Sequence, residues 1–142
     1  MKHISPQGVN LIKKFEGCRL EAYKAVSTEK YYTIGYGHYS ANVKKGQKIS
    51  QLEAEQLLYA DLKRFEAHVN SYDHIYRWSQ GEFDALVSFA FNIGSINQLT
   101  ANGTRSKDVI AQKILAYNKA GKKVLEGLTR RRIAERQVFV NG

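Results

Sequence analysis

The first segment that could do chemistry places an acidic side chain at the predicted end of a helix. Glu16 closes that helix and Gly17 follows it directly. The carboxyl group therefore faces the unpaired carbonyls and the negative end of the helix dipole. This setting disfavours a charged carboxylate and favours the protonated acid, which is the form that a general acid needs.

A second segment, residues 31–36, is rich in aromatic and β-branched residues and predicts a strand that contains Thr33. A hairpin with a strand at 19–24 would bring Thr33 and the loop acids back towards Glu16. A carboxylic acid that faces a second polar group across a cleft is the arrangement that cleaves glycosidic bonds. An ordinary helix-end glutamate beside a structural hairpin is the alternative, and the residues alone leave it open.

Three motifs occur in order along the chain. They are Glu16-Gly17-x-x-Leu20-x-Ala22-Tyr23 with Thr33-Ile34-Gly35-Tyr36-Gly37-His38, then residues 83–94, then Gly127-Leu128-x-x-Arg131-Arg132-x-x-Glu135. Together they resemble the phage-type lysozymes (endolysins, glycoside hydrolase family 24). The resemblance implies a lysozyme-like α+β fold with an N-terminal helix, a small β-hairpin lobe, and a larger helical lobe across a sugar-binding cleft. It also implies a muramidase that cleaves peptidoglycan, inverts the anomeric centre and needs no cofactor.

By resemblance, Glu16 is the general acid and Thr33 helps to hold the attacking water, while His38 is mainly structural. One position departs from the family pattern, because the usual Asp nine residues after the catalytic glutamate is Ala25 here. The loop is also two residues longer, and no Asp precedes Asp61. Glu29 is the candidate for a substitute carboxylate. The alternatives are Glu21, assistance from Ser27, or Thr33 acting without a second acid.

The resemblance also suggests residues that contact the substrate. Tyr39 and Phe91 match cleft-lining positions, and Asn92 either binds an acetamido group or caps a helix. Arg131 either binds peptide carboxylates or covers the surface with Arg132. A cysteine hydrolase built on Cys18 and His38 is disfavoured, because nothing in the sequence indicates an activated thiol. No metal-ligand spacing occurs, so no metal site is expected.

The elements that must position these residues follow from periodicity and capping signals. A helix is predicted over about 5–16, and a β lobe over about 18–49 with strands at 19–24 and 31–36 and a short one within 43–49. Capping boxes at Ser50-x-x-Glu53 and Ser79-x-x-Glu82 open two helices, the second ending near 94. Further helices are predicted over about 106–120 and 129–140. Residues 1–142 are thus expected to form one α+β domain, with residues 50–142 and helix 5–16 in the helical lobe.

Composition limits the partners and the location. The chain has 142 residues and a net charge of +9, from 22 Lys and Arg against 13 Asp and Glu. Such a charge attracts polyanions: nucleic acid, anionic membranes or wall polymers. The motifs select peptidoglycan, and no nucleic-acid recognition motif is present. A catalytically weakened, cationic wall-binding module is the main alternative.

Neither an apolar stretch of membrane-spanning length nor the apolar run of a signal peptide occurs in the sequence. We therefore expect a monomer without a membrane anchor, made in the host cytoplasm and acting on the bacterial wall after release. The single Cys18 excludes an internal disulfide bond.

Overall fold

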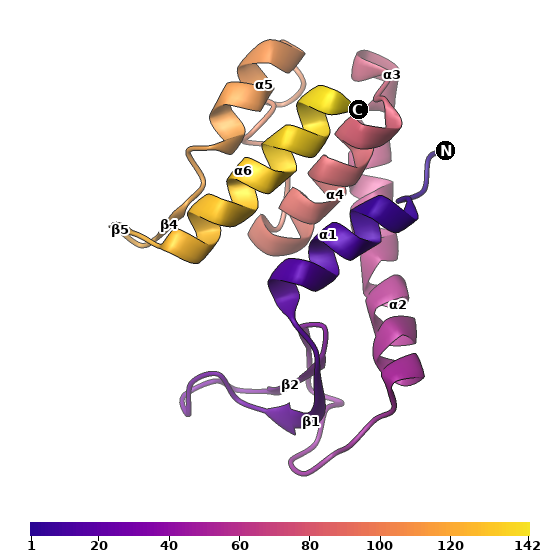
Figure 1. The fold of residues 1–142 in the computed structure, drawn as a ribbon, viewed down its shortest axis with the longest axis vertical. Coiled ribbons are helices and arrows are strands. Elements are labelled where there is room, and N and C mark those ends of the chain that lie inside the picture. The colour runs from indigo at the N-terminus through magenta and orange to yellow at the C-terminus, as the bar shows by residue number, and fades with distance from the viewer. The chain divides into compact units, whose positions relative to one another are not determined.

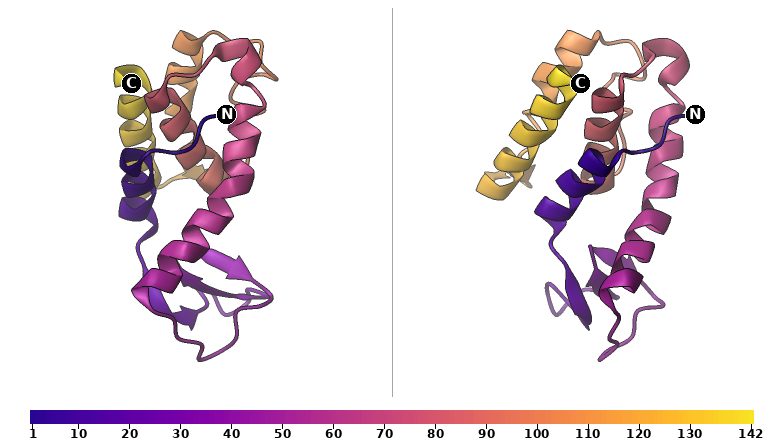
Figure 2. Two further views of the ribbon diagram at one scale, coloured as in Figure 1. Left: turned by 90° about the vertical axis from the view of Figure 1, so that its right-hand side faces the viewer. Right: turned by 45° about the vertical axis from the view of Figure 1, so that its right-hand side comes forward.

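The computed structural model describes all residues, Met1–Gly142. The chain divides into two compact units, here called the β unit (Lys13–Lys63) and the helical unit (Met1–Ile12 with Arg64–Gly142). Figures 1 and 2 show the elements of both. The β unit is wider than the lobe predicted at 18–49, because helices α1 (Pro6–Glu16) and α2 (Gln51–Asn70) each contribute residues to both units. The predicted α+β class is confirmed.

The β unit contains a three-stranded antiparallel sheet in the order β1-β2-β3. The strands are β1 (Arg19–Tyr23), β2 (Tyr32–Gly35) and β3 (His38–Ser40). The two predicted strands are confirmed, but the third lies at 38–40 and not within 43–49, where only Lys48 forms an isolated bridge to Glu21. Three residues with polar side chains at both ends carry too little periodicity to predict a strand.

Two helices connect the sheet to the rest of the chain. Helix α1 (Pro6–Glu16) begins after Ser5, whose hydroxyl accepts a hydrogen bond from the Gly8 N–H at 3.3 Å, as the sequence predicted. Helix α2 (Gln51–Asn70) opens on the predicted capping box, since the Ser50 N–H donates to Glu53 Oε1 at 3.0 Å and the Glu53 N–H donates to Ser50 Oγ at 3.1 Å. Each cap fixes the residue at which its helix begins.

The helical unit is built around α4 (Gln80–Ile93), which opens on the second capping box and is buried along most of its length. Helix α6 (Glu126–Asn141) packs against α4, and α5 (Lys107–Ile114) packs against α6. The short helix α3 (Asp73–Tyr76) precedes α4. None of the helices combines the length and apolarity that a membrane crossing requires.

The stretch after α5 corrects the prediction of a helix over 106–120. The helix ends at Ile114, and β4 (Lys119–Ala120) and β5 (Lys123–Val124) form a short antiparallel hairpin. Gly121, expected as a helix stop, has φ +63° and lies at the hairpin turn, where glycine carries no Cβ penalty. Helix α6 also starts three residues earlier than predicted, and its Glu126 pairs with Arg130 one turn later.

A histidine ties α2 to the segment after α4. His68 Nε2 accepts a hydrogen bond from the Ile96 N–H at 2.9 Å, and Ser95 Oγ lies 3.2 Å from the same nitrogen. Burial lowers the pKa of His68 below its usual value. The folded state therefore favours the neutral imidazole of His68, which can accept this hydrogen bond.

Candidate active site

Glu16 is the last residue of α1, and its half-buried carboxyl group lies against the turn between β2 and β3. Gly17, with φ +66°, ends the helix. A Cβ built on Gly37 would lie 2.8 Å from Oε1 of Glu16, a distance too short for a real contact. Glycine at position 37 therefore leaves the space that the carboxyl group occupies. The hairpin thus returns to Glu16, as the sequence predicted.

Thr33 lies in the central strand of the sheet, four residues before Gly37. It pairs with Tyr23 on β1 and with Tyr39 on β3, and only 9% of its surface is exposed. Its backbone is therefore held on both sides by neighbouring strands, which gives the side chain a fixed place in the β unit.

Glu29 folds back over its own loop. Its Oε1 accepts hydrogen bonds from the N–H groups of Ala25 at 2.8 Å and Val26 at 3.1 Å, and its own N–H donates to the Val26 carbonyl at 3.1 Å. The carboxyl group thus sits beside the backbone of residue 25. Both side-chain bonds use Oε1, so Oε2 is the oxygen that can receive a proton.

His38 holds the same turn to α2. Its Nδ1 lies 2.7 Å from Asp61 Oδ2, which fits the structural role expected for this histidine. Cys18 Sγ lies 3.8 Å from Gln51 Oε1 and its sulfur is reduced. Neither contact places a base on the thiol, so the geometry gives no support to the cysteine hydrolase alternative.

The base of α1 is fixed by an ion pair. Lys13 Nζ lies 2.9 Å from Glu55 Oε1. The hydrogen bond with Glu55 raises the pKa of Lys13, and the hydrogen bond with Lys13 lowers the pKa of Glu55. Gln51 Nε2 donates to the Tyr36 hydroxyl at 2.8 Å and so ties α2 to the turn that faces Glu16.

Tyr39 is the most exposed aromatic side chain near this turn, with 46% of its surface accessible. Its hydroxyl accepts a hydrogen bond from the Tyr31 N–H at 3.1 Å, and the two rings lie 5.4 Å apart at 53°. The hydrogen bond holds an aromatic surface in one orientation, which suits contact with the apolar face of a sugar ring.

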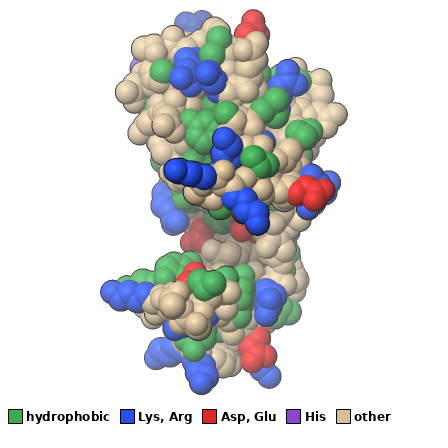
Figure 3. Space-filling model, turned by 90° about the vertical axis from the view of Figure 1, so that its left-hand side faces the viewer, with side chains coloured by type: hydrophobic (Ala, Val, Ile, Leu, Met, Phe, Trp, Pro, Cys, Tyr) green, Lys and Arg blue, Asp and Glu red, His purple; other side chains and the backbone are tan.

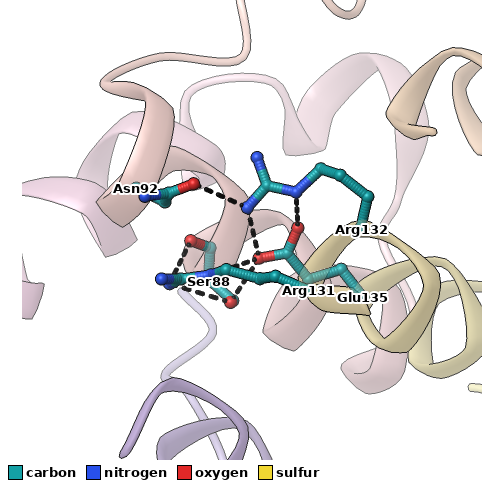
Figure 4. A network of polar contacts seen from close by, with 5 residues as sticks. All are labelled: Ser88, Asn92, Arg131, Arg132 and Glu135. Carbon is teal, nitrogen blue, oxygen red and sulfur yellow. Dashed lines mark hydrogen bonds and ion pairs between the residues drawn. The ribbon is translucent and has the colours of Figure 1, made fainter. Parts of the chain in front are cut away.

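The other three residues predicted to bind substrate belong to the helical unit. Phe91 is half-buried and makes an edge contact with Phe65 at 5.6 Å. Asn92 does not cap α4, since Gly94 is the C-cap residue. Its Oδ1 accepts a hydrogen bond from Arg132 Nη2 at 2.9 Å (Figure 4). Because a guanidinium only donates, Arg132 fixes the amide with its NH₂ group directed away.

Arg131 and Arg132 are both buried, so the alternative that they cover the surface is wrong. Figure 4 shows them converging on Glu135 from one turn of α6. Arg131 Nε donates to Glu135 Oε2 at 3.2 Å, and Arg132 Nε lies 2.8 Å from Oε1. Ser88 on α4 completes the cluster by donating its hydroxyl proton to Glu135 Oε2 at 2.5 Å. The substrate-binding role of Arg131 stays a prediction.

Glu135 and Ser88 are residues whose part in this region sequence reasoning missed. Burial raises the pKa of Glu135 and lowers that of Arg132, and in both cases the attraction between the opposite charges opposes the shift. Spacings of three and four residues from the two arginines were a signal that Glu135 could pair with both. Nothing in the sequence indicated Ser88 as the partner on α4.

No group of three or more His, Cys, Asp or Glu side chains in the structure could hold a metal ion. Two acids of the β unit form ion pairs with basic side chains, Glu55 with Lys13 and Asp61 with His38. The chemistry available at this site is therefore that of carboxyl groups, a threonine hydroxyl and aromatic rings.

Comparison with known proteins identifies relatives along the whole chain. The phage lysozyme family model matches residues 13–135. The endolysin of Bacillus phage B103 is 46% identical over 99% of this chain, and the match covers 55% of that protein. The chain spans little more than half the length of such curated relatives. The endolysin of Salmonella phage P22 is 32% identical over 99% of this chain and 100% of its own length.

A solved structure supports the fold independently. The muramidase domain of SpmX from Asticaccaulis excentricus superposes with a TM-score of 0.86 and is 34% identical, with 99% of each chain covered. The lysozyme-like fold predicted from the sequence is therefore confirmed.

Proposed function

Because this chain belongs to the phage lysozyme family, we propose that it is a muramidase that hydrolyses the β-1,4 bond between N-acetylmuramic acid and N-acetylglucosamine in bacterial peptidoglycan. The observation that carries the proposal is the Glu16 carboxyl group held against Gly37, at the end of the strand that contains Thr33. This juxtaposition supports a catalytic role for an acid that could otherwise be an ordinary helix end. Its expected site of action is the bacterial cell wall.

Glu16 donates a proton to the leaving glycosidic oxygen. Its position supports this role. The Gly37 turn, held to α2 through His38 and Asp61, keeps the group in one place. A positioned acid of this kind contributes typically about 10²–10⁴-fold to the rate.

Thr33 and Glu29 act on the attacking water. Thr33 holds the water through its hydroxyl group, and Glu29 removes the proton through Oε2. What supports the role of Glu29 is the hydrogen bond from the Ala25 N–H, because position 25 stands nine residues after Glu16, where the family pattern has its aspartate. A water that attacks the face opposite to the leaving group gives inversion, which requires carboxyl groups about 6.5–9.5 Å apart.

Tyr39 in the β unit and Phe91 and Asn92 in the helical unit are each proposed to contact the substrate, whereas the buried Arg131 would act by holding α4, the helix that carries Asn92. Tyr39 offers its exposed ring to a sugar, and Asn92 directs its NH₂ group towards a carbonyl oxygen such as that of an acetamido group. The reaction needs no cofactor, and the chain acts as a monomer on a polymeric substrate. Nucleic acid has no part in it.

Clearing of a bacterial wall suspension by the wild-type chain and by Glu16→Gln tests the proposal. We expect the variant to lose nearly all clearing activity while its circular dichroism and melting temperature stay close to the wild type. Glu126→Gln, an exposed glutamate at the start of α6, is the matched control and should clear normally. Full activity of Glu16→Gln would remove Glu16 from the mechanism.

A second candidate function follows from Ala25, which lacks the usual acid. A cationic module that binds walls without hydrolysing them would sediment with the walls and leave their turbidity unchanged. Glu29→Gln separates the remaining possibilities. A loss of less than about tenfold, small for a general base, would indicate that Thr33 positions the water alone.

A further inference from the structure

The hairpin of β4 and β5 is a surface that the proposed hydrolysis does not use. Figure 1 shows it at the start of α6, beyond the end of α5. Residues 119–126 are all exposed, and the hairpin is held by only two cross-strand pairs. Isolated hairpins of this length are marginally stable in water, so its persistence depends on the residues at its base.

The two residues that precede β4 anchor the base of the hairpin to other segments of the helical unit. The Tyr117 hydroxyl donates to Gln98 Oε1 at 2.9 Å, and its ring makes an edge contact with Phe89 at 4.9 Å. Asn118 Nδ2 donates to Thr129 Oγ1 of α6 at 3.0 Å. The tip is therefore presented on a fixed stem.

The tip concentrates positive charge. Lys119, Lys122 and Lys123 surround the Gly121 turn, and residues 109–125 contain no Asp or Glu. The next acid along the chain, Glu126, is already paired with Arg130 at 3.0 Å. Figure 3 views the molecule from the side that carries the hairpin in Figure 1, and it shows Lys and Arg side chains spread over that face with several acidic side chains between them. Lys119 lies opposite Val124 and Lys123 lies opposite Ala120, so the three lysines present their charges side by side to solvent and not to one another across the strands.

We propose that the lysine hairpin, residues 118–125, is a docking surface for a phosphate-bearing anionic polymer of the bacterial wall, such as a polyol-phosphate chain. The location at the wall rests on the proposed function, but the charge complementarity does not. The hairpin has no aromatic side chain on which a nucleic-acid base could stack. Its tip, Ala120-Gly121-Lys122, has no large apolar side chain, and the exposed apolar side chains of the hairpin, Val124 and Leu125, lie at its base.

Sedimentation with purified walls, before and after chemical removal of the phosphate polymer, tests the proposal. All proteins carry Glu16→Gln, so that the walls stay intact during the measurement. The hairpin variant replaces Lys119, Lys122 and Lys123 by Gln. The matched control replaces the exposed Lys44, Lys45 and Lys48 of the β unit by Gln and removes the same charge.

We expect the hairpin variant to bind polymer-bearing walls about 10- to 100-fold more weakly at low salt, given the usual contribution of a lysine near an anionic surface. Both variants should bind stripped walls equally, and Lys→Arg at the three hairpin positions should restore binding. If both variants bind polymer-bearing walls more weakly by the same factor, net charge alone explains the loss and the proposal is wrong. The proposal is also wrong if the hairpin variant loses more binding to stripped walls, to anionic vesicles or to DNA than it loses to polymer-bearing walls.

A second measurement separates this proposal from the proposed function. The same lysine variants, now with Glu16 restored, are tested for clearing of stripped walls. If no protein clears walls while the hairpin variant still loses polymer binding, hydrolysis fails and the docking surface stands. If all proteins clear walls and the hairpin variant binds polymer normally, the docking surface fails alone.

Discussion

Replacing Gly37 by Ala should displace the Glu16 carboxyl group without touching any other catalytic residue. The added Cβ would lie 2.8 Å from Oε1, whereas ordinary van der Waals contact begins at 3.4 Å. The carboxyl oxygen must therefore retreat by about 0.6 Å, and a misplacement of ~1 Å can cost ~10²-fold in rate. We expect kcat to fall by roughly 10- to 100-fold, with KM changed much less.

The same substitution also strains the backbone, because Gly37 has φ +79°. Alanine in this region costs about 1–2 kcal/mol of stability, which corresponds to a loss of several degrees in melting temperature. Gly46→Ala isolates this strain, since Gly46 has φ +78° and no atom within 4 Å of its added Cβ.

The assay is the initial rate of hydrolysis of a defined wall fragment, measured beside the thermal melt of each variant. Gly37→Ala and Gly46→Ala should melt at similar temperatures, yet only Gly37→Ala should be slow. If the two variants hydrolyse equally fast, the close contact between Gly37 and Glu16 does not position the acid, and the reasoning fails.

Three further predictions concern the helical unit. Asn92→Asp keeps an acceptor for Arg132 but replaces the outward NH₂ donor, so we expect unchanged or higher thermal stability and a KM about tenfold higher; an unchanged KM on a soluble oligosaccharide would contradict the donor role. The lowered pKa of His68 means that the folded state disfavours its protonation. The contribution of His68 to the free energy of unfolding is therefore complete above the ordinary histidine pKa of about 6.5. It is lost as pH falls through that value towards the lower pKa of the folded state. Urea unfolding between pH 7.5 and 5 should show this loss of stability, and the loss should be smaller in His68→Gln. If the stability of the variant falls with pH as steeply as that of the wild type, a group other than His68 causes the loss. Glu135→Ala leaves two buried guanidinium groups without their carboxylate and should cost about 3–5 kcal/mol in denaturant unfolding, while a cost under ~1 kcal/mol would show that the cluster tolerates an unpaired charge.

The parts of the fold that the sequence predicts are those whose signals are local. The capping boxes at Ser50 and Ser79, the Ser5-Pro6 helix start and the apolar period of α4 each act within a few residues, and each element begins where it was expected. The return of the hairpin to Glu16 was predictable from the same kind of signal, because a helix end and two strands close together in sequence have few ways to fold.

The rest depends on contacts between distant residues. The end of α5 is set by Tyr117 and Asn118, whose partners lie on other segments of the helical unit. The burial of Arg131 depends on Ser88, which lies 43 residues away along the chain. The position of Glu29 beside Ala25 comes from a loop conformation that no periodic pattern encodes.

The bond between Glu29 and the backbone of residue 25 has a consequence for which residues position 25 can accept. Glu29 binds the main-chain N–H and not the alanine side chain, so nearly every amino acid can stand there without loosening the carboxylate. Proline is the exception, because it has no N–H to donate. An aspartate at position 25 would place a second acid near the first, and the two would compete for one proton. If Glu29 acts as proposed, a saturation library at position 25 should therefore give similar hydrolysis rates for most residues. Proline and aspartate should be the exceptions.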